Sequence, residues 1–298
     1  MSATFEDDLL QRYSDDDLKR FILESPRVES MSRVFILSPN FLGKHYNPDE
    51  VEDALRAMDT ARQLGIRVPC VRRTVMYKSD AYCVMERIPG IVLEEAWMRL
   101  SWVSTMKLAF QLKRFVKLLR SVTASSAGSL ATGKCRSFWL EDRFGIPARS
   151  SPEIITSFVQ FWVDFVSIRK AMKAATEGTG LPKGRVPPTP KSLVFVHHDL
   201  APRNILLDPW GQLWLLDWDY AGFYPRYFEY AAMQNFTQPE EWTRSARLRW
   251  FLFTWVGVGR AERAAKILDG IRSKFTRSPV GRRFEILENG APSGRAVS

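Results

Sequence analysis

The sequence predicts an α+β protein with a small N-terminal lobe, built from a sheet and one helix, and a larger, mainly helical C-terminal lobe. Its length of 298 residues is about that of two domains or lobes. Strand patterns and one helix pattern fill the first 90 residues, whereas apolar residues at helical spacing dominate the remainder. Apolar residues make up 45% and charged residues 26% of the chain, which excludes a fibrous repeat or extensive disorder.

Four segments of the small lobe combine β-branched or aromatic residues with flanking turn residues, as strands do. These segments are residues 33–37, 41–46, 70–76 and 81–87. Between the second and the third, a helix is expected to begin after Asn47, which can cap it, because Pro48 suits the first helical position. Gly65 is expected to end that helix.

The rest of the chain has mainly helical patterns, with three short apolar runs that predict strands. Helices are expected over 101–122, over 151–175 and from about 226 to 275, and strands over 193–196, 205–207 and 213–216. Polar, Gly-rich or Pro-rich composition predicts loops over 123–136 and 176–191. The expected division is an N-terminal extension (1–30), a small lobe (31–88), a large lobe (89–286) and a disordered tail (287–298).

The formal net charge is +10, and it is unevenly spread. Residues 241–298 carry +7, but no aromatic and basic RNA-binding motif accompanies them, so the sequence disfavours a nucleic-acid partner. Residues 101–122 hold five bases and no acid, and Lys113, Lys117 and Arg120 share one helix face. A membrane-surface or anionic-ligand role is one interpretation of this face, and a solvated face opposite a core stripe is the preferred one.

Several protein classes are disfavoured by the sequence. The three cysteines are odd in number and form no CxxC pair, which argues against a disulfide framework or a structural zinc site and favours a reducing compartment. The first residues are acidic and lack the apolar core of a secretory leader. The most apolar stretch, residues 250–258, is too short to span a bilayer. We therefore expect a cytoplasmic protein without a membrane span.

Three polar residues stand at the ends of predicted loops, close to predicted strands. Asp199 follows the strand at 193–196, Asn204 lies five residues further on, and Asp217 follows the strand at 213–216. Two carboxylates and a carboxamide are hard oxygen ligands, which suit Mg²⁺ bound together with substrate phosphates. A carboxylate that is not committed to the metal could accept a proton from an attacking hydroxyl. The alternative is that Asp199 and Asn204 are only turn residues.

Neighbouring side chains leave two further alternatives. Asp219 could be a second metal neighbour, although a cap for the next helix is the preferred interpretation. His197 and His198 could suggest zinc, but neighbours on one strand point in opposite directions and the chain has only three histidines.

The sequence HHDLAPRNIL, followed by LLDWDYAGFYPRYFEY, resembles the aminoglycoside phosphotransferase and choline kinase-like families, and most closely their fungal phosphotransferase-like branch. The segment CVMERIPGIVLEEAW is similar to the strand and interlobe hinge of that branch, and FLGKHY to its ATP-facing lysine strand. The resemblance implies a protein-kinase-like two-lobed fold with an antiparallel N-terminal sheet. It also implies ATP and Mg²⁺ as cofactors and a small hydroxylated molecule as acceptor.

The resemblance also implies a role for each matching residue. Asp199 would orient or deprotonate the acceptor hydroxyl, and Asn204 and Asp217 would hold Mg²⁺. Lys44 would contact the α- and β-phosphates, although a lysine at a strand end is often merely solvated.

At the hinge, the backbone of Glu86 and Ile88 would bind the adenine edge. His197 would brace the catalytic loop.

The chain departs from the family pattern around Lys44. The family lysine pairs with a glutamate of the following helix, but Val51 stands at that position here. Glu50 is the nearest substitute, although Asn47 and Glu50 also have the spacing of a capping pair. No glycine precedes Lys44 in residues 33–40, so the nucleotide-binding lobe is expected to be reduced.

Three functional hypotheses follow. The preferred one is an ATP- and Mg²⁺-dependent small-molecule phosphotransferase, and the alternative is a kinase-like pseudoenzyme or binding module with little turnover. A nucleic-acid or anionic-surface binder has only the net charge in its favour. Since the chain is basic, we expect a neutral or anionic acceptor instead of a polycation.

Overall fold

The computed structural model describes residues 4–29, 31–141, 145–166, 168–180, 183–234 and 236–277, so the tail predicted at 287–298 lies outside the described residues. The chain forms two compact units. The sheet unit consists of Met1–Leu100 and Pro202–Asp219, and the helical unit consists of Ser101–Ala201 and Tyr220–Ser298.

The sheet unit contains a four-stranded antiparallel sheet with the order β1-β2-β4-β3. Its strands are β1 (Val34–Ile36), β2 (Phe41–Tyr46), β3 (Val71–Met76) and β4 (Ala81–Glu86). The four predicted strands and the predicted helix, which is α2 (Pro48–Gln63), are therefore confirmed. Lys44 lies near the middle of the sheet, where it pairs with Cys83 of β4.

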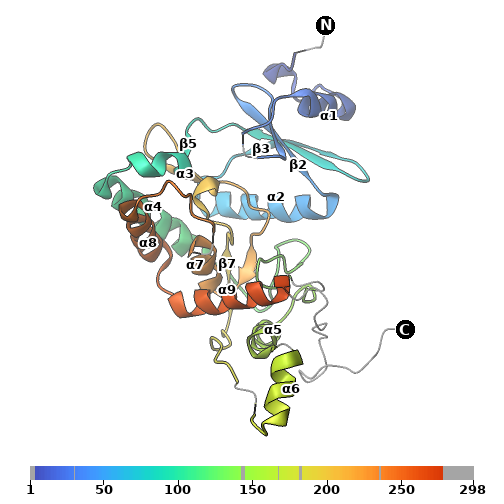
Figure 1. Ribbon diagram of the computed structural model, residues 1–298. Helices are drawn as coiled ribbons and strands as arrows, with labels where there is room; N and C mark the ends of the chain where they lie inside the picture. Colours follow the sequence, from blue (N-terminus) through green and yellow to red (C-terminus); the bar gives the residue numbers. More distant parts are fainter. Residues whose placement is uncertain are drawn as a thin grey trace. The chain divides into compact units, whose positions relative to one another are not determined.

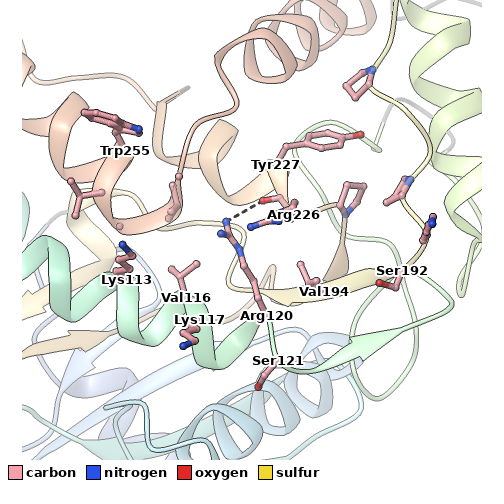
Figure 2. Close-up of a pocket in the computed structure, with 18 of the residues that line it drawn as sticks. Lys113, Val116, Lys117, Arg120, Ser121, Ser192, Val194, Arg226, Tyr227 and Trp255 are labelled. Atoms are coloured by element: carbon pink, nitrogen blue, oxygen red, sulfur yellow. Dashed lines mark hydrogen bonds between the residues drawn. The ribbon is translucent and has the colours of Figure 1, made fainter.

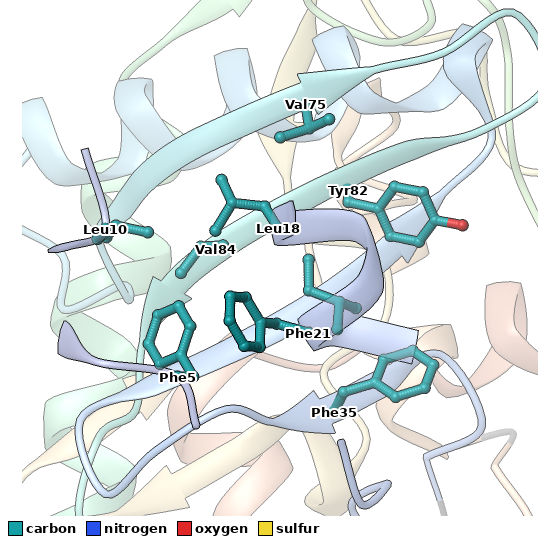
Figure 3. Packing of buried hydrophobic residues seen from close by; sticks show 9 residues of the cluster. Phe5, Leu10, Leu18, Phe21, Phe35, Val75, Tyr82 and Val84 are labelled. Atoms are coloured by element: carbon teal, nitrogen blue, oxygen red, sulfur yellow. The ribbon is translucent and has the colours of Figure 1, made fainter. Parts of the chain in front are cut away.

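Helices cover both faces of this sheet (Figure 1). Alternate residues of each strand point to opposite sides, so each face has its own set of apolar side chains. Helix α2 packs on the face formed by Tyr46, Ala81, Cys83 and Met85. The opposite face is covered by the N-terminal residues, which include the short helix η1 (Asp7–Leu9) and α1 (Asp15–Glu24). Figure 3 shows the resulting apolar cluster, with members Phe5, Leu10, Leu18, Phe21, Ile22, Phe35, Val75, Tyr82 and Val84.

Gly43 allows α1 to approach the sheet closely. A Cβ atom at this position would lie 2.8 Å from Cγ1 of Ile22, which is closer than two carbon atoms pack. Apolar residues of the segment before position 30, such as Phe5, Leu18 and Ile22, are thus part of the core of the sheet unit.

The sheet unit also contains a three-stranded sheet, whose first strand follows the predicted hinge directly. Its order is β5-β8-β9, with β5 (Ile91–Val92), β8 (Ile205–Leu207) and β9 (Leu213–Leu215). The short helices beside it are α3 (Leu93–Ala96), η2 (Trp97–Arg99) and η3 (Pro202–Asn204).

The helical unit contains a small sheet with the order β10-β7-β6, made of β6 (Thr123–Ala124), β7 (Leu193–Val196) and β10 (Gly222–Tyr224). Its helices are α4 (Trp102–Leu119), α5 (Pro152–Asp164), α6 (Ile168–Thr176), α7 (Tyr227–Gln234), α8 (Arg244–Val258) and α9 (Glu262–Arg277). In the described part of the chain, no helix is both long and apolar enough to cross a membrane.

The prediction of one continuous helix over 151–175 is wrong, because the structure has two helices there. Helix α5 ends at Asp164, and Phe165 has an extended backbone. The Lys274 ammonium donates hydrogen bonds to the carbonyls of Trp162, Val163 and Phe165 at 2.8, 2.6 and 3.0 Å. A cation at the carbonyl end of a helix satisfies these acceptors and stabilises the end of the helix.

Candidate active site

Lys44 occupies the centre of a charged cluster in the sheet unit. Its Nζ lies 2.6 Å from Oδ1 of Asp217 and 2.8 Å from Oδ1 of Asp219. The same nitrogen lies 4.6 Å from the centre of the Tyr46 ring. The Lys44 side chain is only 9% exposed, so this lysine is not a solvated strand residue.

Burial and charge act in opposite directions on this cluster. Burial disfavours the charged form of Lys44, but Tyr46, Asp217 and Asp219 outweigh it and hold the lysine pKa well above its usual value. Burial also raises the pKa of Asp219 to about 6, although Lys44 opposes this shift. At neutral pH the cluster therefore contains the Lys44 ammonium and the ionised Asp219 carboxylate.

The backbone of two loops brings Asn204 beside Asp217. The N–H of Leu216 donates to the Asn204 carbonyl at 2.9 Å, which ties the end of β9 to η3. Asp217 has a φ of 61°, a left-handed conformation that is strained for a residue with a side chain. Such strain is common at functional sites, where the surrounding structure holds the residue in place.

A cavity of about 300 Å³ joins these residues to the predicted hinge. Lys44, Glu86, Ile88, Asn204 and Asp217 all line it, so the structure brings together five of the predicted site residues. Its remaining described lining is largely apolar and includes Val34, Leu42, Met85, Leu206 and Leu216. A small cavity with apolar walls and a charged end suits a ligand with a flat apolar part and an anionic part.

Glu50, the expected substitute partner of Lys44, has a different ion pair. Its Oε2 lies 3.5 Å from Nη1 of Arg33, and Lys44 is held by Asp217 and Asp219 instead. The Asn47 side chain makes no capping hydrogen bond at the start of α2, so the alternative of a side-chain cap from Asn47 is also wrong.

The preferred interpretation of Asp219 as a helix cap is wrong. The next described helix, α7, begins only at Tyr227, and Asp219 contacts Lys44. Sequence reasoning missed this contact because Lys44 and Asp219 are 175 residues apart in the chain.

Asp199 belongs to the helical unit, where it is 7% exposed in the loop after β7. Its backbone N–H donates to Nδ1 of His197 at 3.3 Å, so His197 contacts the loop from inside. His198 has a φ of 69°, and burial lowers its pKa to about 3, so its ring stays neutral. The loop that carries Asp199 is thus part of the helical unit.

Glu229 is a functional candidate that the sequence did not reveal. Its two carboxylate oxygens accept the backbone N–H groups of His197 at 2.8 Å and His198 at 3.0 Å. This buried side chain comes from α7 and fixes the backbone of the loop that carries Asp199. The signal that could have identified it is a single acid within the otherwise uncharged helix YFEYAAMQ.

The titration of Glu229 predicts a pH dependence of stability. Burial raises its pKa from 4.5 to about 7, against the opposing hydrogen bonds from His197 and His198. Between these two values the unfolded chain releases the proton while the folded chain keeps it, so the contribution to stability falls as pH rises and is lost above about pH 7. The free energy of unfolding of the wild type, relative to Glu229→Gln, should fall by about 3 kcal/mol from pH 4 to pH 8 in urea titrations. A difference that is independent of pH would contradict this assignment.

The donor set near Lys44 fits a hard divalent cation. Asp217 and Asn204 supply carboxylate and carboxamide oxygens, the ligand types that Mg²⁺ prefers. Within the described ranges, no three His, Cys, Asp or Glu side chains gather to hold a metal by themselves. A cation here would therefore need further oxygen ligands, such as phosphates or water.

Comparisons with known proteins agree with this architecture. The model of the phosphotransferase enzyme family matches residues 27–259. Among solved structures, the chain is similar to an aminoglycoside-3'-phosphotransferase of type VIII, with 19% identity over 88% of this chain and 98% of that one and a TM-score of 0.52. This similarity confirms the predicted fold class.

Two further solved structures are similar at lower scores. One is aminoglycoside phosphotransferase APH(3'')-Id from Streptomyces rimosus in complex with ADP and streptomycin, with 15% identity, coverage of 89% and 99%, and a TM-score of 0.47. The other is choline kinase LicA from Streptococcus pneumoniae, with 13% identity, coverage of 91% and 93%, and a TM-score of 0.42. No curated protein matches the chain.

Proposed function

Since the chain belongs to the phosphotransferase enzyme family, we propose that it transfers the γ-phosphoryl group of ATP, with Mg²⁺, to a hydroxyl of a small molecule. The observation that carries this proposal is the contact of Lys44 with Asp217 and Asp219 in a cavity that also includes Asn204 and the hinge. A lysine, an asparagine and an aspartate with these positions in the sequence are the recurring polar groups of kinase-like sites.

Each residue has a defined task in this proposal. Lys44 offers a permanent positive charge to the α- and β-phosphates, and the backbone of Glu86 and Ile88 offers hydrogen bonds to the adenine edge. Asn204 and Asp217 would hold Mg²⁺, which supplies positive charge to the phosphate oxygens when it is bound.

Asp199 is proposed to accept the proton of the acceptor hydroxyl. It lies five positions before Asn204 in the chain, and a stretch of this length cannot span more than about 18 Å. His197 and Glu229 hold the backbone of its loop, as expected for a group that must be positioned to within a fraction of an ångström.

A second candidate function is a nucleotide-binding module with little turnover. The Arg33 contact of Glu50 favours it, because Lys44 then lacks the usual glutamate partner from α2. The absence of glycine from residues 33–40 also favours it.

Nucleotide binding and turnover separate the two candidates. ATP with Mg²⁺ should raise the midpoint of thermal unfolding of the wild type, because a ligand that binds only the folded state stabilises it. Lys44→Met should abolish that shift, whereas Lys78→Met, which removes a lysine outside the cavity, should leave it unchanged. ATP consumption in a screen of hydroxylated metabolites would support the enzyme, and a thermal shift without any consumption would support the binding module.

We predict a neutral or anionic acceptor. Residues 101–122 carry five bases and no acid, and residues 167–191 carry six bases and one acid, so a polycation would be repelled. Kanamycin should therefore not stimulate ATP turnover in a coupled assay. Stimulation that weakens as the salt concentration rises would reveal an attractive acidic site and contradict this prediction.

The three cysteines are all free, which supports the proposal of a reducing, cytoplasmic location.

A further inference from the structure

The helical unit contains a second cavity, which shares no lining residue with the candidate active site. It has a volume of about 1170 Å³ and is lined by the C-terminal half of α4, residues 187–192, residues 225–227 and the end of α8. Figure 2 shows Lys113 and Val116 of α4, with Arg120 directly after its end, on one side and Tyr227 and Trp255 on the other. We call it the basic cavity, because its charged lining residues are Lys113, Lys117, Arg120, Lys191 and Arg226.

The charge of the basic cavity is of one sign. No acidic residue is among the described residues that line it. An adjoining cavity shares Arg120 and Arg226 with it and adds Arg185, Arg260 and Arg263. The acidic residue of that second lining, Glu262, is paired with Arg260 at 2.8 Å. Cations that line a concave surface without acids attract anions more strongly than the same charges on an open surface.

Arg120 connects the two cavities and has unused hydrogen-bonding capacity. It extends from the end of α4, and Nη2 donates to the Arg226 carbonyl at 3.3 Å (Figure 2). Its Nε is buried and has no hydrogen-bond partner among the described residues. The acid that acts on its charge, Glu229, already accepts the N–H groups of His197 and His198. The nearby acid is therefore already engaged by backbone N–H groups, and an anion in the cavity would give the Arg120 guanidinium a further counter-charge.

Apolar side chains form much of the remaining lining of the basic cavity. Val116 and Val258 lie in it, and Phe110 and Trp255 also line it although they are 58% and 43% exposed. These two exposed apolar side chains lie in the same lining as the basic ones, so the cavity offers apolar as well as cationic contacts. The cavity, with a volume of about 1170 Å³, is large enough to hold a small organic molecule.

We propose that the basic cavity binds a small phosphate monoester with an apolar body. The apolar walls would hold the body, and Arg120 with Lys113 and Lys117 would hold the phosphate, whose charge of nearly −2 matches a cluster of cations better than a carboxylate does. The site is independent of the proposed phosphoryl transfer, because none of its residues is assigned to that reaction.

The test is calorimetric titration of the full chain with 1-naphthyl phosphate, with inorganic phosphate and with 1-naphthol. The naphthyl phosphate should bind more tightly than either fragment, and its affinity should fall as salt rises. Binding should persist in Lys44→Met, which separates this site from the candidate active site. Equal affinities for 1-naphthol and its phosphate, or loss of binding in Lys44→Met, would overturn the proposal.

Variants of α4 locate the site. Lys113→Gln with Lys117→Gln should weaken the naphthyl phosphate affinity by about tenfold or more, and both side chains are exposed, so the fold is retained. The matched control is Lys107→Gln with Arg114→Gln, two exposed bases of the same helix outside the cavity lining. Equal weakening in both pairs would show a diffuse charge effect and refute the site. Binding to vesicles that contain phosphatidic acid, without binding of naphthyl phosphate, would also refute it in favour of a membrane surface.

Discussion

Substitution of Asp199 by asparagine should lower turnover by about 10²–10⁴-fold and leave nucleotide affinity nearly unchanged, because loss of a proton acceptor affects only the chemical step. The matched change Asp217→Asn should act on nucleotide binding instead of on the chemical step alone. It removes a charge from the cluster around Lys44, so Mg²⁺-dependent nucleotide binding should be lost. Single-turnover kinetics and nucleotide titration of both variants measure the two effects separately.

The opposite patterns make this pair of variants decisive. Equal loss of nucleotide binding in both, with full turnover by Asp199→Asn, would contradict the assigned roles. A wild-type chain that binds nucleotide but shows no turnover would support the binding module.

Truncation of Ile22 to alanine should destabilise the sheet unit by about 2–5 kcal/mol, as for other fully buried aliphatic side chains. Ile22 is 0% exposed and contacts Gly43 of the central strand β2. The neighbouring change Leu23→Ala is the control, because Leu23 is 52% exposed on the same helix and should cost no more than about 0.5 kcal/mol. Hydrogen exchange of the β2 and β4 amides, together with urea unfolding, measures both.

The packing of α1 also predicts the result of enlarging Gly43. Gly43→Val places a side chain against Ile22 and should destabilise by about 1–3 kcal/mol. Ile22→Ala in the same chain should relieve part of that cost, because it removes the atoms that clash. Additive effects of the two changes would show that α1 does not pack as described.

Local patterns predicted much of the fold. The strand at 41–46 agrees with β2 to the residue, because a turn precedes it and a helix start follows it directly. The family was also predicted, from the resemblance of the segments around Asp199 and Asp217 to known families, because such a resemblance is carried by short contiguous stretches of sequence.

Contacts between distant residues could not be predicted in this way. The interruption between α5 and α6 depends on Lys274, which is more than 100 residues away from the carbonyls it binds. The Arg33 contact of Glu50 and the Asp219 contact of Lys44 likewise depend on tertiary packing. No periodicity in the sequence contains that information.

The long separation between Lys44 and its carboxylates has a consequence for the order of synthesis. Asp217 lies 173 residues after Lys44, and the sheet unit takes its last segment from Pro202–Asp219. While a ribosome makes the chain, strands β1 to β4 are complete long before that segment emerges, and the ammonium lacks its counterions until then. A buried cation without its partners is costly, so the nascent N-terminal segment must keep Lys44 hydrated. The lysine can be buried only after residue 219 has left the exit tunnel. Residues 101–201, which belong to the helical unit, are made before that point.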